Sequence, residues 1–308
     1  MRGKLKKLFA AVLAVLLALS FSGCSELTGL DAQALMSPPK TTADREAIYA
    51  LMGGGVGDVT LVYPKYGDYR SAIISRDLDG CGTSEVVSFC ANGDAGGTRL
   101  EFFKKNTDGV WSSMARFTSA ATQVDKVFFG DLTGDGMDEI IVGWGDPLTA
   151  TASVSVYYVD GDTIREFSMT TVSYSEMLLT DFDSDNIKEL FVLQAAQTSG
   201  EEIMALGGLY RFDGDQPYVS KTVPLDAAVT RYTSVSFSQV NSWRRAAVLD
   251  GVKADGRMLT QVIGYDEASD RLISPLSNEE NATDRPTAAA AARCTTWAAT
   301  TSAPTSSS

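Results

Sequence analysis

The chain has 308 residues, with 26 Lys and Arg against 39 Asp and Glu, and it contains no histidine. The missing histidine excludes Ser-His-Asp and Cys-His catalysis and every metal site that needs imidazole. The formal net charge of -13 argues against a nucleic-acid partner, because such binding needs a basic surface.

Residues 1–23 have the features of a bacterial export signal. Basic residues come first, and an uncharged, mostly apolar run follows from Leu8 to Phe21. Two small residues, Ser22 and Gly23, follow the run directly before Cys24, and this pattern resembles the lipobox of bacterial lipoproteins. The resemblance implies that Cys24 carries lipid and anchors the chain to the outer face of the cytoplasmic membrane. Phe21 stands where the family usually has Leu, so an ordinary export signal is the alternative.

The next segment links the signal to the rest of the chain. Residues 24–44 contain adjacent prolines and many small or polar residues, a composition that suits a tether. Residues 42–52 then predict one short helix, with Thr42 or Asp44 as its N-cap.

A repeated pattern follows the helix. Each copy has an apolar run, a loop that opens with Asp, and a Glu that leads directly into another apolar run; the loops begin at Asp77, Asp131 and Asp181. A hairpin-type turn follows each loop at a similar distance, at Asp108-Gly109, Asp160-Gly161 and Asp213-Gly214. A degraded fourth copy starts at Ser234, with Gln239 and Asn241 at loop positions 1 and 3 and a turn near Asp266 to Asp270.

The short β-rich runs predict four strands in each copy. In the second copy these are Val124 to Gly130, Glu139 to Trp144, Ala152 to Val159 and Thr163 to Phe167. A four-stranded unit that recurs at about 50 residues predicts an all-β, propeller-like array of about four blades over residues 45–285, not necessarily complete. A β-sandwich with evenly spaced turns is the alternative.

The loops place oxygen-bearing side chains at positions 1, 3, 5 and 9. The third loop has four carboxylates there: Asp181, Asp183, Asp185 and Glu189. The second loop has Asp131, Thr133, Asp135 and Glu139. The first loop keeps Asp77, Asp79 and Glu85 but has Cys81 at position 5, and sulfur is a soft donor that Ca²⁺ does not favour. Because Ca²⁺ takes about six to eight oxygens, these loops are candidate calcium sites. Metal-free turns, capped by their own Asp side chains, are the alternative.

The loop pattern differs from an EF-hand, since it closes at position 9 and lies between strands. It resembles the FG-GAP or VCBS repeat, the calcium-loop blade of the integrin α-subunit propeller and of many bacterial secreted proteins. The resemblance covers the chain from about Ser71 to Ile273. It implies a β-propeller with Ca²⁺ in its blade loops and a role in binding or surface organisation, and it fixes no ligand and no reaction.

Other residues offer weaker indications. Cys81 and Cys90 are predicted to be separate thiols, because the strand after Glu85 carries Cys90 away from the loop. The tryptophans suit sheet packing better than a sugar-stacking platform; they are Trp111, Trp144 and Trp243. Three tyrosines form a candidate exposed binding patch: Tyr63, Tyr66 and Tyr69.

Residues 286–308 consist mainly of Ala, Thr and Ser and lack the blade pattern, which indicates a low-complexity, disordered or frameshifted tail. Two functions are compatible with the whole sequence. The favoured one is a lipid-anchored, calcium-stabilised module that binds an unidentified protein or glycan. The alternative is a carbohydrate-active lyase or hydrolase that uses Tyr, Lys and carboxylates, but no catalytic residue can be assigned.

Overall fold

The computed structural model describes seven stretches of the chain, residues 43–55, 57–145, 152–168, 172–199, 202–214, 216–239 and 245–274. The predicted export signal, Cys24 and the predicted tail lie outside them, as do Trp243 and nearly all of the tether. The chain divides into two compact units, residues 1–46 and residues 47–308, and every strand belongs to the second unit.

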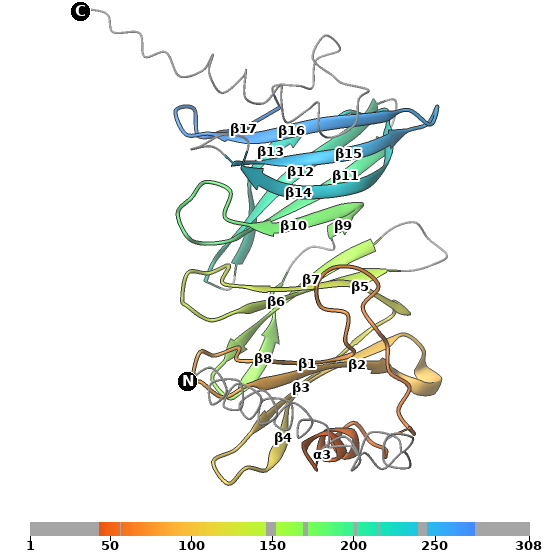
Figure 1. Ribbon diagram of the computed structural model, residues 1–308, viewed down its shortest axis with the longest axis vertical. Helices are drawn as coiled ribbons and strands as arrows, with labels where there is room; N and C mark the ends of the chain where they lie inside the picture. The colour runs from red at the N-terminus through yellow and green to blue at the C-terminus, as the bar shows by residue number, and fades with distance from the viewer. Residues whose placement is uncertain are drawn as a thin grey trace, which may run out of the picture. The chain divides into compact units, whose positions relative to one another are not determined.

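The strands form four sheets, and within each sheet they pair antiparallel in chain order (Figure 1). The first sheet contains β1 (Ile73–Arg76), β2 (Glu85–Ala91), β3 (Thr98–Lys105) and β4 (Trp111–Ser119), with the 3-10 helix η2 (Gly93–Ala95) after β2. The second contains β5 (Gln123–Gly130), β6 (Glu139–Gly145), β7 (Ala152–Asp160) and β8 (Thr163–Glu166), and β9 (Val172–Tyr174) also pairs with β7. The third contains β10 (Glu176–Thr180), β11 (Glu189–Ser199), β12 (Glu202–Asp213) and β13 (Gln216–Pro224). The fourth contains β14 (Val229–Gln239), β15 (Arg245–Lys253), β16 (Met258–Asp266) and β17 (Arg271–Ile273).

This architecture confirms the all-β fold of four-stranded, blade-like sheets. The four strands predicted for the second copy agree with β5 to β8 to within about one residue at each end. The predicted turns join the third and fourth strands of the first three sheets, and the glycines in them have positive φ: Gly109, Gly161 and Gly214. In the degraded fourth copy the predicted turn joins β16 to β17. The two-sheet sandwich considered from the sequence is therefore wrong.

Apolar residues join sheets that follow one another in the chain. Phe89 of the first sheet and Trp144 of the second belong to one buried cluster, and Ile141 of the second shares another with Leu190 of the third. A third cluster joins the third sheet to the fourth. Among the described residues no cluster joins the fourth sheet back to the first, so the array is not a closed ring.

Helix α3 (Ala43–Leu51) confirms the short helix predicted before the sheets. Past its end, Met52 joins Ile48 in a buried cluster with Val86 and Phe103 of the first sheet. These residues lie on the side of that sheet opposite the second sheet, because Val87 and Phe102 pack toward the second. Among the described residues, no helix has the length and apolar character needed to cross a membrane.

Candidate metal centre

The three acidic loops occupy the same place in three successive sheets. Each loop joins the first strand of its sheet to the second: β1 to β2, β5 to β6, and β10 to β11. The closing glutamates, Glu85, Glu139 and Glu189, are the first residues of the second strands. The hairpin therefore fixes both ends of every loop, and only the residues between them can rearrange.

The backbone of the three loops follows the same path. Positions 4 and 6 have positive φ in every copy: Gly80 and Gly82, Gly134 and Gly136, and Ser184 (67°) and Asn186 (72°). Glycine adopts this conformation readily, whereas a side chain such as that of Ser184 makes it costly by about 1–2 kcal/mol. The third loop keeps the conformation without glycine, so its surroundings must impose it.

The carboxylate that opens each loop accepts a hydrogen bond from the amide at position 6. The N···O distances are 2.9 Å from Gly82 to Asp77, 2.9 Å from Gly136 to Asp131 and 3.1 Å from Asn186 to Asp181. These bonds fold each loop back on its first residue. The capping that the metal-free alternative requires is thus present.

The glutamate that closes each loop accepts a hydrogen bond from the amide at position 2. The N···O distances are 2.9 Å from Leu78 to Glu85, 2.6 Å from Leu132 to Glu139 and 2.8 Å from Phe182 to Glu189. All three glutamates are almost completely buried, with exposed fractions of 3%, 2% and 0%. A carboxylate that is this deeply buried needs compensation from donors or cations.

Burial changes the acidity of these glutamates. Desolvation, with repulsion from Asp135 and Asp131, raises the pKa of Glu139 to about 7. Desolvation, with repulsion from Asp183, also raises the pKa of Glu189 to about 7, against the opposing effect of Arg211. The pKa of Glu85 is raised as well, chiefly by desolvation.

The third loop gathers its carboxylates most closely. Oxygen atoms of Asp181, Asp183 and Glu189 lie within 4.8 Å of one another. Arg211 of β12 places its guanidinium among them: Nη2 donates to Glu189 Oε1 at 2.6 Å, to Asp185 Oδ2 at 3.3 Å and to Asp183 Oδ2. Three of the four predicted ligands thus form one close group, and Asp185 is connected to it through Arg211, the internal cation.

The second loop has a different interior. Thr133 donates from Oγ1 to Glu139 Oε1 at 3.5 Å, and Asp135 Oδ1 accepts from the Met137 amide at 2.8 Å. In the part of the chain that the structure describes, Asp131, Asp135 and Glu139 are not a group of three carboxylates within 4.8 Å. Its predicted ligands therefore line one loop but are less closely gathered than those of the third.

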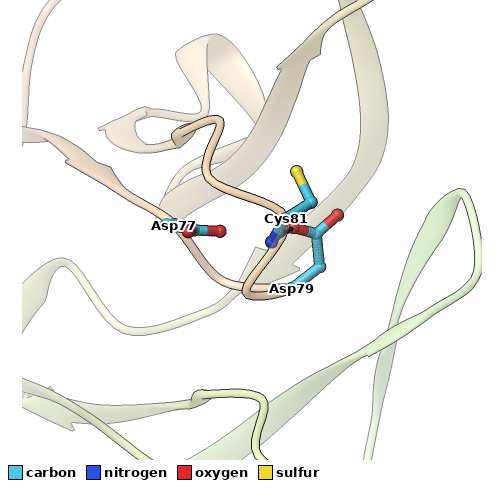
Figure 2. A group of neighbouring side chains, drawn as sticks. All are labelled: Asp77, Asp79 and Cys81. Atoms are coloured by element: carbon cyan, nitrogen blue, oxygen red, sulfur yellow. Dashed lines mark hydrogen bonds between the residues drawn. The ribbon is translucent and has the colours of Figure 1, made fainter.

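The first loop brings together a different set from the one predicted. Figure 2 shows Asp77, Asp79 and Cys81, whose ligand atoms lie within 4.8 Å of one another. Glu85 is not part of this group. Cys81 is exposed, Cys90 is buried, and the two are separate thiols, as predicted. This donor set suits Ca²⁺ less well than those of the other loops, because it contains sulfur.

The loops also contact one another through their backbones. The Asp138 amide of the second loop donates to the Leu78 carbonyl of the first at 3.0 Å, and the Lys188 amide of the third donates to the Asp131 carbonyl of the second at 3.0 Å. Arg76 of β1 adds an ion pair to Asp138. A change in one loop can therefore be transmitted to its neighbour.

Sequence reasoning did not identify Arg211 as part of the site. The residue follows Tyr210, the partner of Leu190 in the β11–β12 pair, and it therefore stands beside Glu189. Lys104 and Tyr158 have the corresponding places in the first and second sheets. Aligning these three positions would have found Arg211, but β11 and β12 are longer than their counterparts, so the sequence spacing differs.

Comparison of the chain with protein-family models and with curated proteins finds no match. Membership in the FG-GAP or VCBS family is therefore not established.

Proposed function

We propose that the chain is an extracytoplasmic, lipid-anchored lipoprotein whose FG-GAP/VCBS-type blades are stabilised by calcium and form a binding or surface-organising module for a protein or glycan. The observation that supports this most is the recurrence of one loop structure at the same hairpin of three successive sheets. The loops share positive φ at positions 4 and 6 and the same bonds to the opening Asp and closing Glu.

The donor chemistry of the second and third loops fits calcium. Asp181, Asp183, Asp185 and Glu189 would hold the ion in the third loop; Asp131, Thr133, Asp135 and Glu139 would hold it in the second. Calcium supplies positive charge that these oxygen-rich, partly buried loops otherwise lack or draw from the protein itself. Asp77, Asp79 and Glu85 of the first loop form a poorer site, because Cys81 replaces an oxygen donor.

Calcium binding is tested directly by isothermal titration of the full chain, purified in detergent and treated with a chelator. We expect saturable binding that weakens in Asp135→Ala and in Asp183→Ala. Asp94→Ala is the matched control, since Asp94 is an exposed carboxylate in η2, outside the loops. No saturable heat with the wild-type chain would contradict the proposal.

The tyrosine patch is the ligand surface that this proposal favours. Tyr63 and Tyr66 are 60% and 49% exposed, in a segment held by backbone bonds to Phe89 and Asp125. Tyr69 instead packs against Phe129, with ring centroids 4.7 Å apart, so the patch is smaller than predicted. Exposed aromatic rings on a fixed backbone bind sugars or protein side chains at low entropic cost.

A glycan array and a pull-down from cell envelope test this surface. The double variant Tyr63→Ser/Tyr66→Ser should lose the ligand, whereas Tyr218→Ser, a 48% exposed tyrosine in the third sheet, should keep it. Equal binding by both variants would exclude the patch.

Trp144 is 4% exposed within a core cluster, as the sheet-packing interpretation predicted, and is not a sugar platform.

The anchor requires a separate test. Cys24→Ala should move the chain from the membrane fraction to the medium and abolish incorporation of a labelled fatty acid, because one cysteine would carry the lipid. Cys81→Ala is the matched control. Label that persists in Cys24→Ala would contradict lipidation at this residue.

A further inference from the structure

Arg211 lies among three of the carboxylates that are predicted to hold an ion in the third loop. It is carried by β12, next to Tyr210, which pairs with Leu190 directly after Glu189. Cross-strand pairing of adjacent strands therefore holds the guanidinium over the closing residue of the loop. The position is set by the sheet rather than by the loop itself.

One nitrogen of Arg211 contacts three carboxylates. Nη2 is 2.6 Å from Glu189 Oε1 and 3.3 Å from Asp185 Oδ2, and it also contacts Asp183 Oδ2. Arginine commonly binds one carboxylate with two parallel bonds. Here several carboxylates instead surround a single positively charged group, as the ligands of a metal ion do.

The guanidinium does not satisfy this cluster completely. Asp183 Oδ1 and Arg211 Nε are both buried and have no hydrogen-bond partner among the described residues. The Asp183 side chain is 12% exposed and that of Glu189 is 1% exposed, so water compensates them poorly. Buried polar atoms without partners cost free energy, which a ligand that uses more of the oxygens would recover.

The first and second sheets lack this arrangement. Lys104, at the corresponding position of the first sheet, pairs with Asp162 between β7 and β8. Tyr158, in the second sheet, packs on Phe167 with ring centroids 4.4 Å apart. Among the described residues, neither side chain forms a hydrogen bond or ion pair with its own acidic loop, and Lys104 acts on Asp79 and Glu85 only through its charge. The internal cation is therefore a feature of the third sheet.

We propose that Arg211 is an internal cation that holds the third loop together in the absence of calcium, and that calcium binds this loop only by displacing the guanidinium. This inference rests on the proposed calcium function. It divides the loops into two kinds. The third loop remains ordered without metal and binds calcium weakly, whereas the second loop has no internal substitute and depends on the ion.

The test measures calcium binding and thermal unfolding of the full chain with Arg211→Gln. Arg165→Gln is the matched control, because Arg165 pairs with Asp160 in the second sheet with both side chains largely exposed. We expect Arg211→Gln to bind calcium at the third loop at least about tenfold more tightly, or about 1.4 kcal/mol. It should also unfold at a lower temperature in chelator, and recover in calcium. Adding Asp183→Ala should remove the gained site, which assigns it to the third loop.

Arg211→Lys is a second variant in case Arg211→Gln does not fold. It keeps the charge but not the planar, delocalised guanidinium, so its calcium affinity should lie between those of the wild type and Arg211→Gln.

Three other outcomes are informative. Calcium binding of unchanged affinity in both Arg211 variants would overturn the inference and leave the proposed function intact. If Arg211→Gln loses as much stability in calcium as in chelator, Arg211 is only part of a structural ion pair, and the inference is overturned. If neither the wild type nor any of these variants binds calcium, the proposed function and the inference are both overturned.

Discussion

The second and third loops share a backbone but differ in what lies inside them. In both, the opening Asp accepts the position 6 amide, the closing Glu accepts the position 2 amide, and Asp at position 5 accepts the position 7 amide. In the third loop Arg211 joins the carboxylates, and in the second the corresponding residue is Tyr158, which packs elsewhere. The two loops thus share their backbone hydrogen bonds but differ in the residue on the neighbouring strand, and also at positions 3, 4 and 6 of the loop itself.

The difference shows that an acidic loop need not depend on a metal in order to keep its shape. Its negative charge can be compensated by a divalent ion or by a side chain from the same sheet, and the two solutions compete for the same oxygens. Whether a blade depends on calcium is then decided outside the loop. The following variants would break or sharpen this contrast, and they are ordered by the expected size of the effect.

Removing the closing glutamates should have the largest effect. In chelator, Glu189→Ala should lower the free energy of unfolding by about 3 kcal/mol, because it leaves the Phe182 amide unpaired and removes the most buried partner of Arg211. Glu139→Ala should cost only about 1–2 kcal/mol, because it also relieves repulsion from Asp131 and Asp135. Urea unfolding measures both, and a larger loss in Glu139→Ala would contradict the contrast.

Substitutions at position 4 should affect the second and third loops differently. Gly134→Ala should destabilise the chain by about 1–2 kcal/mol, since φ is 81° and the new Cβ would meet Ile187 Cδ1 at 2.8 Å. Ser184→Gly should stabilise it, or leave it unchanged, because glycine relieves strain at φ 67° but increases the entropy of the unfolded chain. A gain in Gly134→Ala would show that the second loop is not held as described.

Giving the second loop an internal cation should reduce its dependence on calcium. Tyr158→Arg should lower the stabilisation by calcium by about 1 kcal/mol, the scale of one typical net hydrogen bond. Tyr158→Met loses the same ring contact with Phe167 without adding charge, and it should respond to calcium as the wild type does. An identical response in the two variants would contradict the idea that charge at this position is decisive.

Lys104 should matter least. Lys104→Gln removes an exposed ion pair with Asp162, and such pairs contribute little to stability. We expect its unfolding midpoint in chelator to match that of the wild type, unlike the midpoint of Arg211→Gln. A loss in Lys104→Gln as large as that in Arg211→Gln would mean that both cations stabilise their loops.

The blade pattern could be predicted from sequence because it is local. Turns such as Asp160-Gly161 and the hairpin loops are set by neighbouring residues, so the strand limits, and even the fourth turn, followed from one chain. Arg211 could not, since its role depends on pairing between β11 and β12, whose lengths differ from those of their counterparts. The contact of Ile48 and Met52 with the first sheet was equally non-local.

The grouping of Asp77 and Asp79 with Cys81 instead of Glu85 also could not be predicted. Spacing places all four side chains in one loop, but only the three-dimensional path of that loop decides which of them meet. Apolar pattern and turn chemistry therefore gave the fold, and side-chain contacts across strands had to come from the structure.

Thermal unfolding of the full chain, with and without millimolar calcium, tests the central claim most directly. Binding that saturates at a calcium concentration 100-fold above Kd would add about 2.7 kcal/mol to stability. We predict a higher midpoint in calcium for the wild type, a smaller rise in Asp135→Ala, and an unchanged rise in Asp94→Ala. A wild-type midpoint that is the same in calcium and in chelator would contradict the account.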